Sequence, residues 1–404
     1  MVDLWLYGTR LARIAFERRS RMRLSYAEEA IDRWGLGSRV FTVSQPLTTA
    51  TLTPGPTAAV VEGLLPEGDA LAVLMGQFGS QENLLLELGR ETIGAVVAVE
   101  SDADLPLYKL GDDPAPLRES DIAARLRGLP TAPLGVSKET EVRLSLPGVQ
   151  SKLPLGFVDG VYVDPSYSIP SAVILKPEPS AWPGMVDLES WGLSVLRAAG
   201  VPTPDWSIEA FEGIRTLVVH RYDREPGADP EHRRIHQEDL CMALGLRPGE
   251  KYASSHRSKT ALSHLASVVY ENSATPEVDM QAFVTILVVN VAIGNADAHA
   301  RNLSLLHLPD GSVRLAPAYD VIPTYHYPSH SRHLAQPVDR DVLRPESVTG
   351  AHLRAEVESW GIPGMDMALD AAYERVEHAL DKTDLPLPSP PLEELMGRYE
   401  RLRP

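Results

Sequence analysis

Hydrophobic and polar residues alternate along the first part of the chain, as in strands with one buried face. Val2–Tyr7 and Leu11–Phe16 both alternate and flank Gly8-Thr9, so they predict a β-hairpin. Val40–Leu52 predicts a further extended stretch, which Pro54-Gly55-Pro56 closes. The chain is therefore expected to open with a small sheet.

The pattern then changes to the three- and four-residue spacing of amphipathic helices. This spacing covers residues 70–75 and 84–88 and predicts a helix at each. Residues 88–96 are mostly apolar but contain two glycines, and they predict a strand interrupted by glycine. Residues 1–100 are thus predicted to form one small α+β domain.

The next segments predict a linker and the start of a second domain. Residues 101–135 are rich in Pro, Asp and Arg with weak periodicity, which indicates a linker carrying one short helix at 121–127. Glu141–Phe157 predicts two extended arms around a Leu-Pro-Gly turn, and Ala172–Pro177 a β-branched strand. We assign this second domain to residues 136–224.

One helix and one hairpin complete the second domain. Apolar residues recur at helical spacing from Leu188 to Ala199, and Gly200 follows as a stop signal. Trp206–Phe211 and Ile214–Tyr222 then predict a hairpin around Glu212-Gly213.

Residues 225–404 are predicted to be mainly helical, with a proline-rich stop at 386–391. The predicted helices lie at Gln237–Leu244, Met280–Ile293, Leu369–Leu380 and Leu392–Leu402. Together with the first 224 residues, this gives an α+β fold class.

Composition is that of a soluble globular protein: 44% of the 404 residues are hydrophobic. The longest apolar run, Phe283–Ile293, contains Thr285 and Asn290 and is too short to span a bilayer. Met1–Leu4 lacks the features of a signal peptide. The single cysteine, Cys241, excludes an internal disulfide, so we expect a cytoplasmic protein with no membrane contact.

The net charge of −17 argues against this chain alone binding a phosphate backbone, because that affinity comes from clustered Lys and Arg. One local basic cluster exists near the N-terminus. It consists of Arg10, Arg13, Arg18, Arg19, Arg21 and Arg23. We interpret it as the solvated outer face of a hairpin, and any contact with DNA as indirect, through a basic partner.

Two carboxylates and one amide interrupt an otherwise apolar stretch and suggest phosphoryl transfer. Asp297 is followed five residues later by Asn302, and Asp320 comes about two strands further on. Phosphoryl transfer from a nucleotide needs a carboxylate near the acceptor hydroxyl and oxygen ligands for Mg²⁺. The catalytic loop of protein kinases has the same Asp-to-Asn spacing. The alternative is that these residues cap helices and form turns.

Upstream residues add further kinase-like features. Lys176 ends a β-branched strand, the position from which a kinase lysine reaches the α and β phosphates. Glu189 lies near the start of the following helix, where it can pair with Lys176 or simply favour the helix N-terminus. In a two-lobed kinase, residues 220–222 would be the hinge that holds adenine.

In chain order, these motifs resemble the sequence blocks of HipA-type serine/threonine kinases, the toxins of HipBA toxin–antitoxin modules. The matching blocks are Ser145–Lys152, Ile174–Lys176, Arg221–Arg224, Gln237–Cys241, Gly294–Asn302 and Tyr319-Asp320, preceded by Glu62–Gly68, Gly89-Arg90 and Gly94-Ala95. The resemblance covers nearly the whole chain. It implies a two-lobed protein-kinase-like fold with a small N-terminal domain (1–100), a linker (101–135), an N-lobe (136–224) and a helical C-lobe (225–404).

The resemblance also implies roles for individual residues. Asp297 matches the catalytic base, Asn302 and Asp320 the Mg²⁺ ligands, and Ser145 the serine that such kinases autophosphorylate. The residues that match the ATP site are Pro147, Gly148, Val149, Gln150, Ser151, Lys152, Lys176, His220, Arg221, Tyr222, His299, Arg301 and Tyr319, with Glu189 and Asp223 in support. Two positions depart from the family pattern. Pro147 replaces a small residue and could stiffen the phosphate loop, and His220 replaces an acidic residue, which is tolerable if only its backbone contacts adenine.

The function that this resemblance implies is an ATP- and Mg²⁺-dependent protein kinase toxin. It would phosphorylate a translation factor such as an aminoacyl-tRNA synthetase, inactivate itself at Ser145, and pair with a HipB-like DNA-binding antitoxin. Two alternatives stay open: a small-molecule kinase of the aminoglycoside or lipid type, and a catalytically weak HipA-like binding module.

Overall fold

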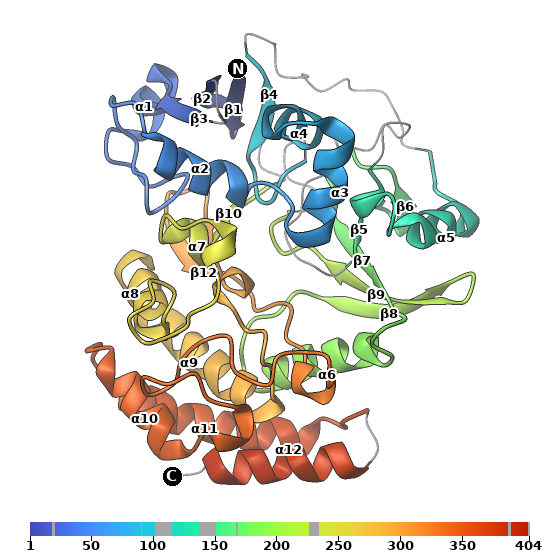
Figure 1. The fold of residues 1–404 in the computed structure, drawn as a ribbon, viewed down its shortest axis with the longest axis vertical. Helices are drawn as coiled ribbons and strands as arrows, with labels where there is room; N and C mark the ends of the chain where they lie inside the picture. The colour runs from blue at the N-terminus through green and yellow to red at the C-terminus, as the bar shows by residue number, and fades with distance from the viewer. Residues whose placement is uncertain are drawn as a thin grey trace.

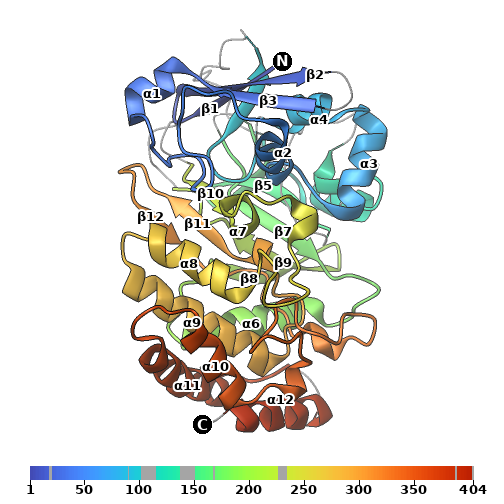
Figure 2. The same cartoon turned by 60° about the vertical axis from the view of Figure 1, so that its left-hand side comes forward.

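The computed structural model describes residues 1–17, 21–89, 91–101, 115–136, 151–166, 169–225, 234–386 and 389–402. The fold is α+β, with a small first domain at the top of the view, a sheet-based N-lobe below it on the right, and a mainly helical C-lobe that extends to the bottom (Figure 1). The turned view shows that the first domain also contacts the C-lobe directly, where helix α2 (Pro54–Gly63) lies above helix α7 (Leu240–Ala243) (Figure 2).

The first domain is a four-stranded antiparallel sheet covered by helices. Its elements are β1 (Val2–Leu6), β2 (Thr9–Glu17), β3 (Arg21–Tyr26), β4 (Val97–Glu100), α1 (Glu28–Trp34), α2 (Pro54–Gly63), α3 (Gly68–Phe78) and α4 (Gln81–Leu88). The strand order is β3-β2-β1-β4. Along β3 every second side chain is buried and the others, including Arg21 and Arg23, are exposed. The predicted hairpin and both predicted helices are therefore confirmed, and the described arginines of β3 face solvent.

Two predictions in this domain were wrong. Val40–Leu52 contains no strand and only one isolated bridge, from Leu52 to Leu24, and Pro54 begins helix α2 because proline is tolerated in the first helical turn. Gly94 lies in a turn rather than a strand: its φ is +69°, and a Cβ there would lie 2.5 Å from the backbone nitrogen of Gln237. Strand β4 starts only after this close approach.

The N-lobe is built on a five-stranded antiparallel sheet in the order β6-β5-β7-β9-β8. Its elements are β5 (Leu153–Val158), β6 (Val161–Val163), β7 (Val173–Pro177), β8 (Trp206–Phe211), β9 (Ile214–His220), α5 (Glu119–Gly128), the short 3₁₀ turn Pro133–Gly135 and α6 (Met185–Ala198). The predicted short helix of the 101–135 stretch is α5, and its buried Ile122 and Leu126 pack with apolar residues of the sheet. The arms predicted at 141–157 are described only from residue 151 onward.

The C-lobe holds a three-stranded sheet, β10-β11-β12, and six helices among its described residues. Its elements are β10 (His236–Asp239), α7 (Leu240–Ala243), α8 (Leu262–Asn272), α9 (Pro276–Ile293), β11 (Ser304–His307), β12 (Val313–Leu315), α10 (Gly350–Ser359), α11 (Met365–Lys382) and α12 (Ser389–Leu402). Four 3₁₀ turns complete it, at Pro248–Glu250, Ala300–Asn302, Thr324–His326 and Pro345–Ser347.

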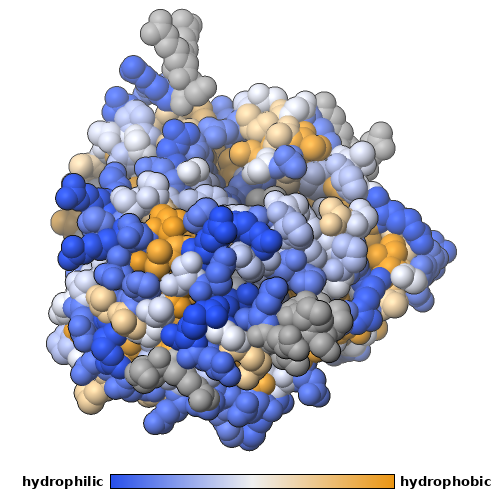
Figure 3. All heavy atoms as spheres, turned by 60° about the horizontal axis from the view of Figure 1, so that its bottom comes forward, coloured by the Kyte–Doolittle hydropathy of each residue, from blue (hydrophilic) through white to orange (hydrophobic). Residues whose placement is uncertain are grey.

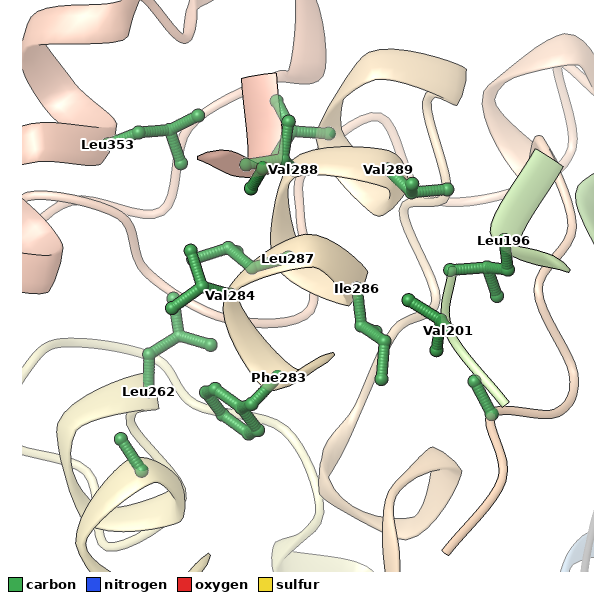
Figure 4. Packing of buried hydrophobic residues seen from close by; sticks show 14 of the residues in the cluster. Leu196, Val201, Leu262, Phe283, Val284, Ile286, Leu287, Val288, Val289 and Leu353 are labelled. Atoms are coloured by element: carbon green, nitrogen blue, oxygen red, sulfur yellow. The ribbon is translucent and has the colours of Figure 1, made fainter. Parts of the chain in front are cut away.

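Helix α9 is the centre of this lobe. By length and composition it could cross a membrane, but two thirds of it is buried inside the fold. Its apolar side chains point to all sides, toward α8, α10 and the segment that follows α6 (Figure 4). Because neighbours surround residues 283–293, this part of the helix is apolar on nearly all sides, and only Thr285 and Asn290 in it are polar.

Two boundaries in the C-lobe differ from the sequence prediction. Gln237–Asp239 belongs to strand β10, which pairs with β11, and only a single helical turn follows it as α7. Helix α12 starts at Ser389, inside the segment predicted as a proline stop, since prolines are tolerated in a first turn. The helices predicted around Met280–Ile293 and Leu369–Leu380 are confirmed as α9 and α11.

Candidate active site

One pocket lies where the first domain, the N-lobe and the C-lobe meet. Its lining residues are Glu67, Ile93, Lys152, Ile174, Lys176, Glu189, Leu193, Pro204, Val219, His220, Arg221, Tyr222, Asp223, Gln237, Arg301, Asn302, Tyr319 and Asp320. Several of the sequence-predicted site residues are therefore brought together in one place.

Lys176 is the charged centre of the pocket. Its Nζ donates to Glu189 Oε1 at 2.5 Å and to Asp320 Oδ1 at 2.9 Å. Burial lowers the pKa of Lys176, but Asp320 and Glu189 outweigh that effect and raise the pKa above its usual value. The ammonium group therefore stays charged and is held in place by two carboxylates on separate elements, the loop before Val321 and helix α6.

Asp320 is held ready for a cation. Burial raises its pKa, but Lys176 and Lys152 outweigh burial and lower the pKa to about 2, so the carboxylate is ionised. Its backbone φ is +58°, a conformation in which Asp and Asn are enriched among non-glycine residues. The hairpin of β11 and β12 precedes it, as the sequence predicted.

Asn302 offers an oxygen to the same pocket. Its Nδ2 donates to the backbone carbonyl of Asp297 at 2.9 Å, so the amide nitrogen points away and the amide oxygen remains to face the pocket. An amide oxygen and an ionised carboxylate are the oxygen ligands that Mg²⁺ takes in nucleotide sites, where phosphates and water supply the rest. Asn302 and Asp320 therefore fit a Mg²⁺ site.

Asp297 lies at the edge of this site and is not among the pocket-lining residues. Its Oδ1 accepts a hydrogen bond from the Tyr252 hydroxyl at 2.7 Å, and its backbone N–H donates to Asn295 Oδ1 at 3.1 Å. Asn295 is fixed in turn by Asn290 of α9 through an amide contact of 3.0 Å. The carboxylate is half-buried, next to Asn302.

Two backbone N–H groups of the predicted hinge, residues 220–222, are already hydrogen-bonded to other segments of the N-lobe. The backbone N–H of His220 donates to the carbonyl of Asp205, and that of Arg221 to the carbonyl of Ala172, both at 2.8 Å. Tyr222 stacks on Tyr319 with ring centroids 6.0 Å apart. This leaves the backbone at Tyr222 as the better candidate for contact with a base.

The side chains of Arg221 and Asp223 are engaged in a buried ionic cluster. Arg221 donates to both oxygens of Asp223, at 2.9 and 2.7 Å, and Glu91 of the first domain accepts from Arg224 at 2.8 Å and from Arg234 at 2.7 Å. Loss of one partner from such a buried charge pair strongly destabilises the folded protein, because the other charge is left buried and unpaired. The cluster therefore joins the first domain to the hinge.

Other predicted residues stand outside the pocket or lie in undescribed parts of the chain. His299 packs edge-on against the ring of Tyr252, with centroids 5.2 Å apart, and Ser151 is exposed. Ser145 and the loop residues Pro147, Gly148, Val149 and Gln150 lie outside the described residues. Lys152, the last residue of the predicted phosphate loop, lines the pocket.

Sequence patterns did not reveal several lining residues, above all Glu67, Ile93 and Gln237. Glu67 lies in the Glu62–Gly68 block that carries part of the resemblance. That block predicted the first domain, but it did not predict that Glu67 lines the pocket. Across the described part of the chain, no group of three or more His, Cys, Asp or Glu side chains is arranged to hold a metal. Cys241 is buried in helix α7.

Comparisons with known proteins agree with this architecture. Residues 2–99 match the family model of the HipA N-terminal domain, and residues 144–383 match that of the HipA-like C-terminal domain. A protein of Sinorhizobium fredii named "Putative kinase Y4mE" is 30% identical over 394 residues, which are 95% of this chain and 92% of that protein.

Two further relatives come from Shewanella oneidensis. The serine/threonine-protein kinase toxin HipA is 27% identical over 348 residues, covering 82% of this chain and 77% of that protein. A solved complex of HipA with HipB and operator DNA matches with a TM-score of 0.78 at 23% identity, over 100% of this chain and 96% of that chain, and it shows the shared fold. The chain belongs to the family of HipA-type kinases.

Proposed function

We propose that this protein is an ATP- and Mg²⁺-dependent serine/threonine protein kinase and the toxin of a toxin–antitoxin pair. The observation that carries this proposal is Lys176, held by Glu189 and Asp320 in a pocket that Asn302 also lines. A lysine, a helix glutamate and a metal-binding aspartate are the set that positions nucleotide phosphates in kinases.

In this mechanism Lys176 and Lys152 bind the phosphates of ATP, and Tyr222 and Tyr319 form a wall for the nucleotide. Asn302 and Asp320 would hold Mg²⁺, which neutralises charge on the phosphates when bound. Asp297 accepts or orients the proton of the acceptor hydroxyl as its oxygen attacks the γ-phosphorus and ADP leaves. The chain thus contributes mainly positioning and fixed charge.

The acceptor that we propose is a Ser or Thr of a translation factor such as an aminoacyl-tRNA synthetase, and the partner a HipB-like antitoxin. The chain would touch DNA only through that antitoxin, since its own net charge is −17. We also place it in the cytoplasm, away from membranes. The face shown in Figure 3 is mostly hydrophilic with small separate apolar patches, which suits a soluble protein.

Ser145 is proposed as an autophosphorylation site that switches the kinase off. A phosphate adds roughly −1.5 to −2 charges at neutral pH. Next to a loop that binds ATP phosphates, this charge would repel the nucleotide. The kinase would then lose activity as the phosphate accumulates.

The proposal is tested by incubating the purified protein with γ-labelled ATP and Mg²⁺, with and without a cell lysate. We expect label on a lysate protein, identified by mass spectrometry, and label on the kinase itself at Ser145 that is absent from Ser145→Ala. Aminoglycosides and lipids serve as parallel acceptors. Label on one of those alone would instead establish a small-molecule kinase, and no label anywhere would leave only a binding module.

A pH prediction follows from Lys152. Burial, together with the neighbouring Lys176, lowers the pKa of Lys152 from its usual value to about 8. Raising the pH from 7 to 9 should therefore remove its positive charge and weaken ATP binding, measured by titration calorimetry. In Lys152→Arg the charge persists, because guanidinium stays protonated in proteins, so its affinity should stay flat over this range. An equally flat wild-type curve would contradict a phosphate-binding Lys152 whose pKa is lowered to about 8.

A further inference from the structure

Glu67 of the first domain reaches into the active site of the C-lobe. It precedes helix α3 as its N-cap residue, but its side chain makes no capping hydrogen bond. Instead the carboxylate is buried, with the residue 8% exposed, and lines the pocket that also holds Asn302 and Asp320. A buried carboxylate away from its own helix needs partners elsewhere.

Its partners are two cations of the C-lobe. Glu67 Oε2 accepts from Lys251 Nζ at 3.0 Å and lies 3.2 Å from an η nitrogen of Arg301, off the direction of a hydrogen bond, so the second contact is an ion pair. Burial raises the pKa of Glu67, but Arg301 and Lys251 outweigh it and lower the pKa. The carboxylate is therefore charged at neutral pH.

Lys251 leads to the predicted catalytic base. Its backbone carbonyl accepts from the N–H of Ala300, inside the loop that runs from Asp297 to Asn302, at 3.2 Å. The next residue, Tyr252, donates its hydroxyl to Asp297 Oδ1 at 2.7 Å. Burial and the Asp297 carboxylate raise the pKa of Tyr252, so the hydroxyl keeps its proton and remains a donor.

Arg301 is part of the same loop and is anchored on its other side. Its Nε donates to Asp239 Oδ2 at 2.7 Å, and a terminal nitrogen donates to the carbonyl of Gly63 at 3.4 Å. Gly63 belongs to the first domain, like Glu67. The loop is therefore held from the first domain through both a side chain and a backbone carbonyl.

We propose that Glu67 is a positioning residue for phosphoryl transfer: it fixes the catalytic loop through Arg301 and sets Asp297 through the Lys251-Tyr252 segment. This inference rests on the kinase function proposed above. The first domain thereby becomes a working part of the active site rather than a separate module. Small displacements of a reacting group reduce rates steeply, so loosening this anchor should be visible in turnover.

The test compares Glu67→Gln with a matched control in the full-length protein. Glu62→Gln breaks another ion pair between the same two parts of the chain, in which Glu62 accepts from Arg247 Nε at 2.8 Å. That pair lies at the surface, where the Arg247 side chain is 60% exposed, and Glu62 is not among the pocket-lining residues. Both variants remove one negative charge from the first domain.

We expect Glu67→Gln to lower label transfer at saturating ATP by about ten- to a hundredfold. Its affinity for ATP should stay equal or increase, because a negative charge near the phosphates is removed. Glu62→Gln should match the wild type in both. Glu67→Asp keeps the charge and should recover part of the rate.

Two outcomes would overturn the inference. In one, Glu67→Gln transfers label as fast as the control. In the other, rate, ATP affinity and melting temperature fall together, which indicates a merely structural role. If the wild type transfers no label at all, the kinase function fails instead. Hydrogen exchange of the backbone amides at 297–302 then decides alone: faster exchange in Glu67→Gln than in Glu62→Gln supports the anchor, and equal exchange refutes it.

Discussion

Replacing Asp297 by asparagine should lower phosphoryl transfer by about a hundredfold to ten-thousandfold, the usual contribution of a general base. Asparagine keeps the shape of the side chain and an oxygen that can still accept from Tyr252, so the loop should stay in place. Only the ability to take up the acceptor proton is lost. Label transfer from ATP at saturating concentration measures the rate.

The control for this variant is Asp310→Asn. Asp310 is an exposed aspartate of the turn between β11 and β12, where its carboxylate accepts from Ser312. Its replacement should leave both transfer and ATP binding unchanged. Full activity of Asp297→Asn would contradict the assignment of the base, and equal losses in both variants would point to general destabilisation of the lobe.

The second large effect is expected for Asp320→Asn. Asparagine tolerates the positive φ at this position, whereas alanine would be strained there. The change removes the ionised carboxylate that we assign to Mg²⁺ and weakens one of the two contacts that hold Lys176. Transfer should fall by roughly a hundredfold or more, the scale of losing one electrostatic stabiliser of the transition state.

The signature of this variant is its response to metal. Wild-type affinity for ATP should rise when Mg²⁺ is added, and in Asp320→Asn this rise should disappear. Without Mg²⁺ the variant should bind ATP at least as tightly as the wild type, because a negative charge has been removed from the pocket. Calorimetric titration of ATP with and without Mg²⁺ measures both. A variant that still gains affinity from Mg²⁺ would rule out Asp320 as a ligand.

Membership in the HipA-type family argues against one alternative function, the small-molecule kinase. The two family matches together cover both the first domain and the lobes, whereas a small-molecule kinase of the aminoglycoside or lipid type would share the catalytic Asp and Asn but not this first domain. The contacts of Glu67 and Glu91 show why that domain matters physically: both carboxylates are buried against cations of the other lobes. The pocket is complete only when all three parts are present.

The structure also explains why some predictions were accurate and others were not. Alternation and helical spacing found β1, β2, α3, α4, α6 and α11 because each buries one face against its own neighbourhood. They missed β10 because His236–Asp239 pairs with β11, nearly seventy positions further along the chain, and a buried four-residue strand has no distinctive periodicity. The apolar residues of Met280–Ile293 predicted helix α9, whose first turn, from Pro276, lies outside the predicted range.

By itself, the sequence determined the chemical groups that can act and the local elements that carry them. Lys176 and Glu189 are only 13 residues apart, on a strand and the helix after it, so their pairing could be anticipated from local order. Only the tertiary structure decided which distant groups surround them: Asp320 is 144 residues from Lys176, and Glu67 is 184 residues from Lys251. Contacts over such separations depend on how whole domains pack, and local spacing carries no record of that packing.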